Sequence, residues 1–151
     1  MFANRLFIAA IATLSVAACS SVPYAQRISA RQAAYTAAAR DPVRSFRFFE
    51  LYSWEPLGDS KLAIYTKPSE AYLVSVMGPC PDLEFTNAIG LTSNLNEVQV
   101  RFDKVLTGRR DFPCTIGEIR PVDLARLKSV EHEQRKIQST QREAAADKPA
   151  P

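Results

Sequence analysis

The sequence predicts a mainly β domain, a small antiparallel sheet or barrel of about five to six strands with a C-terminal helix. Short β-prone runs follow one another between Ser45 and Ile119, turn residues separate them, and no long helical stretch comes between them. The chain has 151 residues, of which 46% are hydrophobic and 23% charged. That length and composition suit one modest core with appendages at both ends.

Each expected strand is bounded by turn residues. The expected strands cover residues 45–54, 61–66, 70–77, 97–103 and 114–119. Pro79 and Pro81 must end the third run, because proline donates no backbone hydrogen bond to a ladder. The run 97–103 alternates, which predicts Phe102 inward with Val98 and Val100, and Arg101 outward with Gln99 and Asp103. Residues 83–91 are ambiguous between a strand and a short helical turn.

Helical patterns flank the expected sheet. Residues 26–40 are rich in alanine, which favours a helix, but alanine offers a weak core face and we expect marginal order. Pro121 is expected to open the C-terminal helix, with Asp123 in its first turn, where the helix dipole favours an acid. Leu124, Leu127 and Val130 give that helix one short apolar face, and its continuation is polar.

The N-terminus has the order of a secretory signal. Arg5 is followed by the apolar run 6–14 and then by small residues, and that run is too short to span a bilayer. Val16-Ala17-Ala18-Cys19 resembles the lipobox of bacterial lipoproteins. The resemblance implies cleavage before Cys19 and acylation of that residue, and Ser20 after it implies export to the outer membrane.

The expected organisation has four parts. They are a signal peptide (1–18), a lipidated tether (19–40), a β domain (41–127), and a polar helix extension with a disordered tail (128–151). The tether holds three bases (Arg27, Arg31 and Arg40) and no acid, which suits anionic headgroups or merely keeps the linker soluble. Residues 41–120 hold nine bases and eleven acids, so we expect no nucleic-acid partner.

Two cysteines remain after Cys19 is set aside. An oxidising compartment makes a disulfide between Cys80 and Cys114 the expected state. The alternatives are a redox pair, which usually has close spacing, and a zinc site, for which His132 is the only histidine. We therefore expect a structural disulfide, no metal and no cofactor.

Four segments carry a family resemblance. They are Trp54-Glu-Pro-Leu-Gly-Asp59, Gly78-Pro-Cys-Pro-Asp-Leu83, Ala88-Ile-Gly-Leu-Thr-Ser93 and Cys114-x-Ile-x-x-Ile-Arg-Pro-Val-Asp123. Together they resemble a family of small Gram-negative lipoproteins classed as a domain of unknown function. The resemblance implies one fold over about residues 46–127, an anchor and a paired Cys80 and Cys114, and it implies no mechanism.

The sequence offers a binding surface rather than a catalytic set. Nucleophilic catalysis needs a base beside Ser or Cys, and His132 lies in a polar helix, so we expect no enzyme. Glu50 shares the period-two face of Phe46, Phe48, Tyr52 and Trp54. If that face is buried, Glu50 needs Arg101 or Arg120 as a partner. If it is open, its aromatic rings suit a sugar or aromatic ligand.

The expected role is binding or envelope organisation at the periplasmic face of the outer membrane. One alternative is a ligand-binding module on the aromatic face near Trp54, with Tyr52, Glu50 and Arg120 as further candidates. Another is an accessory to envelope assembly, which would dock through the charged helix over residues 123–142. The expected partners are the membrane, through the acyl chains, and an unknown periplasmic ligand or envelope protein.

Overall fold

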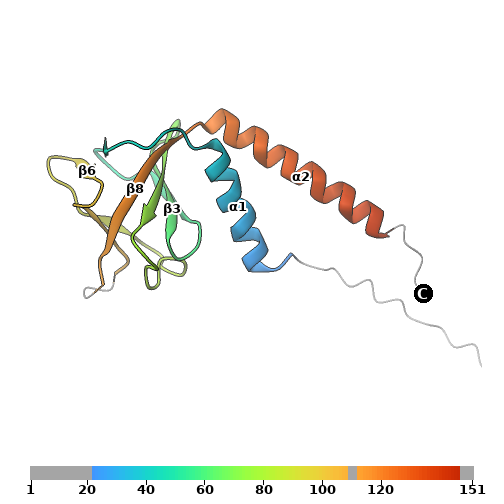
Figure 1. Cartoon of the computed structure of the whole chain (residues 1–151), viewed down its shortest axis with the longest axis horizontal. Helices are drawn as coiled ribbons and strands as arrows, with labels where there is room; N and C mark the ends of the chain where they lie inside the picture. Colours follow the sequence, from blue (N-terminus) through green and yellow to red (C-terminus); the bar gives the residue numbers. More distant parts are fainter. Residues whose placement is uncertain (1–21, 109–111, 147–151) are drawn as a thin grey trace, which may run out of the picture.

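The chain folds into a curled antiparallel sheet with two helices beside it (Figure 1). The computed structural model describes residues 22–108 and 112–146. Helix α1 (Tyr24–Ala38) lies beside the sheet, and helix α2 (Leu124–Ala146) runs away from it at an angle. The mainly β class and the C-terminal helix that the sequence predicts are confirmed. Cys19 and the signal segment lie outside the described residues.

The main sheet has six antiparallel strands in the order β2-β3-β4-β8-β7-β5. Its strands are β2 (Ser53–Pro56), β3 (Lys61–Lys67), β4 (Glu70–Val76), β5 (Gly90–Leu91), β7 (Lys104–Leu106) and β8 (Cys114–Val122). The sheet curls into half a barrel. The β3–β4 hairpin and its turn lie where the sequence places them, because turn residues separate two runs of β-prone residues.

A second, two-stranded sheet joins β1 (Ser45–Arg47) to β6 (Glu97–Gln99), with Phe46 opposite Val98. The predicted single strand over 45–54 is therefore wrong, because β1 and β2 belong to different sheets. Between them the chain leaves strand geometry, although the Phe48 amide still donates to the Asn96 carbonyl at 3.0 Å. A change of pairing partner leaves no mark in the hydrophobic pattern.

Both faces of the central strands are buried. On one face of β3, Leu62 and Ile64 pack into a cluster with Val74 of β4, within the curl. On the other face, Ala63 packs into a second cluster with Leu73. Because neighbouring side chains in a strand point to opposite faces, these strands supply both clusters.

Helix α1 covers the second cluster and is firmly packed, contrary to the weak core face expected from alanine. Ala34, Tyr35 and Ala38 are fully buried against the sheet. Small side chains bury little area, but they let the helix backbone approach the strands closely. The helical part of the expected tether thus belongs to the same packed unit as the β domain.

The alternating run 97–103 keeps strand geometry only to Gln99. Val98 is buried as predicted, but the side chain of Phe102 is 79% exposed, so its predicted inward position is wrong. The cause is a turn in which Arg101 adopts a positive φ of 69°, which ends the alternation of side chains.

The junction between β8 and α2 lies later than the sequence indicates. Pro121 belongs to β8 rather than to the helix, and its carbonyl accepts the amide of Arg40 at 2.8 Å. Asp123 precedes α2, and its Oδ1 accepts the backbone amides of Ala125 and Arg126, each at 3.1 Å. Asp123 therefore caps the helix, which agrees with the predicted favourable acid at its start.

The ambiguous segment 83–91 is mostly irregular. Turns occupy its first part, and only Gly90–Leu91 pair, as β5, with β7. Leu83 is nevertheless fully buried in the cluster within the curl. The expected turn at 107–111 falls partly outside the described residues.

Candidate functional site

The aromatic face singled out in the sequence borders a cavity of about 430 Å³, called here the aromatic cavity. It lies between the segment after β1 and the β3–β4 hairpin. Its lining residues are Arg47, Phe48, Phe49, Glu50, Thr66, Lys67, Glu70 and Tyr72. A volume of this size falls in the range of small-molecule sites.

Phe48, Phe49 and Tyr72 line this cavity, and Phe46 packs against two of them. Phe46 is buried, and its ring stacks on Tyr72 with 4.6 Å between centroids and 17° between planes. The rings of Phe46 and Phe48 lie 6.0 Å apart in a tilted arrangement. Phe49 lies at the rim with 96% of its surface exposed, so it offers a ring face to a ligand.

Three polar side chains in contact with one another, those of Tyr72, Glu70 and Lys67, form the polar side of the cavity. The Tyr72 hydroxyl donates to Glu70 Oε1 at 2.6 Å, and Lys67 Nζ lies 3.2 Å from Glu70 Oε2. Desolvation and the bond to Glu70 raise the pKa of Tyr72 to about 12. The same bond from Tyr72, with help from Lys67, lowers the pKa of Glu70. At neutral pH Glu70 is therefore a carboxylate and Tyr72 a neutral phenol.

Of the four residues predicted for a ligand surface, Glu50 alone lines this cavity, and it is exposed. Tyr52 is 61% exposed just before β2, and its amide donates to the Tyr65 carbonyl at 3.0 Å. Trp54 lies in edge strand β2, opposite Ile64 in the register, and is half-buried. The break between β1 and β2 separates these residues from the buried Phe46.

Arg120 does not line the aromatic cavity and instead binds backbone carbonyls. Its Nε donates to the Arg40 carbonyl at 2.7 Å and its Nη2 to the Ala39 carbonyl at 3.3 Å, which holds the chain after α1 against β8. It pairs only loosely with Glu118, at 3.9 Å. Glu50 needs neither Arg120 nor Arg101, because it is not buried.

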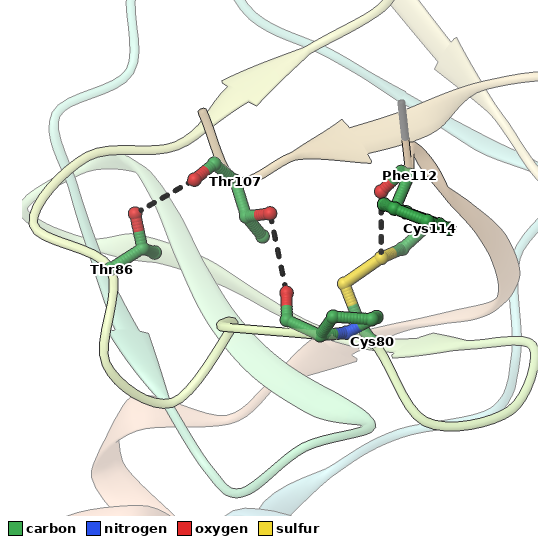
Figure 2. Close-up of a disulfide and its surroundings, with 6 residues drawn as sticks. Cys80, Thr86, Thr107, Phe112 and Cys114 are labelled. Carbon is green, nitrogen blue, oxygen red and sulfur yellow. Dashed lines mark hydrogen bonds between the residues drawn. A yellow bond between two sulfur atoms is a disulfide. The ribbon is translucent and has the colours of Figure 1, made fainter. Parts of the chain in front are cut away.

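The predicted disulfide is present, joining Cys80 and Cys114 with 5.6 Å between their Cα atoms (Figure 2). It links the loop after β4 to the first residue of β8. Beside it, the Thr107 hydroxyl donates to the Pro81 carbonyl at 3.3 Å, and the Thr86 hydroxyl donates to the Thr107 carbonyl at 3.2 Å (Figure 2). These contacts fix the irregular loop after β4 to the sheet.

A polar network missed in the sequence ties both helices to the sheet. Arg31 of α1 makes a bidentate pair with Glu55 of β2, at 2.7 and 2.6 Å, and a further ion pair with Glu131 of α2. The buried Tyr35 hydroxyl donates to Glu55 at 2.9 Å and lies 2.7 Å from the Tyr65 hydroxyl. The hydrogen bond to Glu55 raises the pKa of Arg31, and desolvation raises that of Tyr35.

The same contacts change the interpretation of the tether arginines. Arg31 is engaged as described, and Arg40 pairs with Asp123 at 3.0 Å. Arg27 lies over the Tyr24 ring, 5.8 Å from its centroid, and forms no ion pair within the described ranges. Two of the three positive charges thus hold the fold together rather than being free for headgroups.

In residues 22–108 and 112–146, no group of three or more His, Cys, Asp or Glu side chains is placed to hold a metal ion. Within these same ranges, no helix combines the length and apolar character needed to cross a membrane.

Comparison with known proteins defines the class of this chain. The model of a family of unknown function, DUF6491, matches residues 2–138, so the chain belongs to that family. Neither the curated proteins nor the solved structures contain a match. The function of this family is unknown.

Proposed function

We propose that this protein is a lipoprotein anchored through Cys19 in the outer membrane, where it presents its β domain to the periplasm for binding or envelope organisation. The observation that carries the proposal is Val16-Ala17-Ala18-Cys19, placed directly after the apolar run of a secretory signal. Several acyl chains, each contributing about 0.8 kcal/mol per buried CH₂, make such an attachment effectively permanent.

Two features of the domain support this proposal. A disulfide such as Cys80–Cys114 persists in oxidising compartments and is rare in the cytosol. Helix α1 begins at Tyr24, five residue steps after Cys19, and an extended chain spans at most about 18 Å over five steps. A lipid on Cys19 would therefore hold the firmly packed α1, and with it the whole domain, close to the bilayer.

The deciding experiment is the intact mass of the protein purified from membranes, with and without reduction and thiol alkylation. The expected mature chain starts at Cys19 and carries acyl chains. Two alkyl groups should be added only after reduction. A Cys19→Ser variant should lose the acyl mass and leave the membrane fraction, while Cys80→Ser should keep both. An unacylated wild-type protein in the membrane fraction would overturn the proposal.

A second role, ligand binding in the aromatic cavity, is favoured by the exposed ring of Phe49 beside Phe48 and Tyr72. Rings in such a position stack on sugars or aromatic ligands. The test is titration with N-acetylglucosamine followed by the fluorescence of Trp54, the one tryptophan of the chain. A response that Phe49→Ala abolishes and Phe85→Ala preserves supports this role. An unchanged emission together with unchanged thermal stability opposes it.

A further inference from the structure

A second hollow, of about 610 Å³, lies beside the small β1–β6 sheet and is called here the arginine hollow. Its lining residues are Arg44, Ser45, Glu97, Gln99, Val100, Arg101, Phe102 and Gly117. The ion pair between Arg47 and Glu97, 3.4 Å, joins the aromatic cavity to this hollow, because each residue lines one of the two. None of the residues predicted from sequence as a ligand surface lines it.

A rigid turn over residues 99–103 forms one wall of the hollow. Asp103 Oδ2 accepts the Gln99 amide at 2.7 Å, and its Oδ1 accepts the Thr92 hydroxyl at 2.8 Å. The Arg101 amide donates to the Ile116 carbonyl at 2.7 Å, and the Ile116 amide donates to the Asp103 carbonyl at 2.9 Å. The turn is thus bonded both within itself and to β8.

Two energetically unfavourable features of this turn, a left-handed residue and an exposed aromatic ring, lie at the hollow. Arg101 has a φ of 69°, a left-handed conformation that is unfavourable in a residue other than glycine. Phe102 next to it leaves 79% of its surface exposed. Backbone strain of this kind, held by surrounding hydrogen bonds, is concentrated at binding and active sites.

The charge in the arginine hollow is unbalanced. Within the described parts of the chain, neither Arg44 nor Arg101 forms an ion pair. Among the described residues of the lining, Glu97 is the one acid, and it is already engaged by the Ser45 hydroxyl at 2.5 Å and by Arg47. Two guanidinium groups therefore remain for an anion, and guanidinium geometry matches carboxylate and phosphate oxygens.

A β-bulge shapes the part of the lining that comes from β8. Ser75 faces Glu118 in the register, whereas Val76 faces Ile116, so Gly117 is the extra residue. A Cβ at Gly117 would come within 3.1 Å of Met77 Cγ, so a side chain there would displace Met77. Bulges are over-represented beside functional sites, where they redirect the chain.

We propose that the arginine hollow binds an anionic sugar, with Arg44 and Arg101 holding its carboxylate or phosphate and Phe102 packing against its ring. The guanidinium groups without an ion-pair partner would bind the anionic group of the ligand, and the exposed aromatic ring would pack against its sugar ring. This inference goes beyond the proposed lipoprotein role, and it holds or fails on the purified protein whether or not Cys19 is acylated.

Three sugars that share one ring test the proposal: glucuronate, glucose 1-phosphate and glucose. Each is titrated into the isotope-labelled, membrane-purified protein, and amide shifts in NMR spectra locate the site and give the Kd. We expect at least one anionic sugar to bind in the millimolar range or better, at least about tenfold more tightly than glucose. The amides of Arg101, Phe102 and Gly117 should shift. Binding of only one anionic sugar would identify the charged group.

Variants separate charge from ring contact. Arg44→Gln and Arg101→Asn should each weaken binding at least about tenfold, and asparagine tolerates the left-handed conformation at position 101. Phe102→Ala should weaken binding of the sugar but not of inorganic phosphate. Arg126→Gln, an exposed change on α2, should have no effect. Equal binding of glucose, no binding of any of the three sugars below about 10 mM, or unchanged binding in Arg44→Gln would overturn the proposal.

Discussion

Reduction of the Cys80–Cys114 disulfide should destabilise the domain by about 4 kcal/mol. The two cysteines are 34 positions apart, and closing an unfolded loop of that length costs about 4 kcal/mol in chain entropy. The crosslink removes that freedom from the unfolded chain in advance. Its loss should therefore lower the free energy of unfolding by that amount.

The folded state should change little on reduction. Both cysteines are buried, at 2% and 8% exposure, and after reduction their sulfur atoms need to separate only to van der Waals contact. Each end of the loop is also held independently, because the Cys80 amide donates to the Asp59 carbonyl at 2.7 Å and Cys114 begins β8. The effect should therefore arise mainly in the unfolded ensemble.

Urea unfolding followed by Trp54 fluorescence, with and without a reductant, measures the effect. Besides a lower midpoint, the slope of stability against urea should rise, because the reduced unfolded chain exposes more surface. The double variant Cys80→Ala/Cys114→Ala serves as the control and should not respond to reductant. An unchanged midpoint in wild-type protein whose thiols are shown to be free by alkylation would refute the reasoning. It would mean that the loop is already constrained when unfolded.

Three further predictions concern the helices and the aromatic cavity. Tyr35→Phe should cost about 1–3 kcal/mol in urea unfolding, because it removes the buried hydroxyl that bonds Glu55, whereas Tyr52→Phe at an exposed hydroxyl should cost less than about 0.5 kcal/mol. Equal losses in the two would contradict the network. Asp123→Ala should reduce helicity in circular dichroism more than Asp123→Asn, since asparagine still caps α2, and identical spectra would argue against the cap. Tyr72 has a folded pKa of about 12 against its ordinary 10.0, so its contribution to stability is full below pH 10.0 and is lost as the pH rises through about 12. Tyr72→Phe should reduce the fall in thermal midpoint over that range, and an identical fall would be evidence against the shift.

The sequence predicted best those elements whose partners are close in the chain. The β3–β4 hairpin follows from two β-prone runs and the turn at Pro68, and both strands lie where expected. The break within 45–54 could not be predicted, because it depends on β6, about 50 positions further along the chain, pairing with β1 but not β2. Nonlocal pairing leaves no local signal.

Helix α1 shows a second limit of sequence patterns. Hydrophobic periodicity weighs side chains by their apolar size, so Ala34 and Ala38 count for little. Packing against a sheet rewards small size as well, because it brings the backbones close. The one large buried residue, Tyr35, also needs a hydroxyl partner, which Glu55 on a distant strand supplies. That partner could not be identified without the fold.

The candidate sites depend on the same limits. Alternation assigned Phe102 to the core because a period-two pattern takes no account of the left-handed conformation that Arg101 adopts. The signal that existed was Asp103, a residue type that often bonds nearby backbone amides and favours turns. Exposure of an aromatic ring in a position that pattern predicts as buried is informative, because ordinary burial energetics do not favour it.

The fold also fixes which way the sites would face if Cys19 carries the anchor. Helix α1 begins five residues after Cys19 and is held to the sheet by Arg31 and Tyr35, so the domain would not swing on a long flexible tether. The small sheet containing β6 lies at the end of the domain remote from the helices (Figure 1). The arginine hollow beside β6 would then face away from the anchored end and be open to ligands in the periplasm. Inserting a flexible Gly-Ser linker after Ser20 should leave binding to the hollow unchanged, because the hollow and the anchor do not share residues.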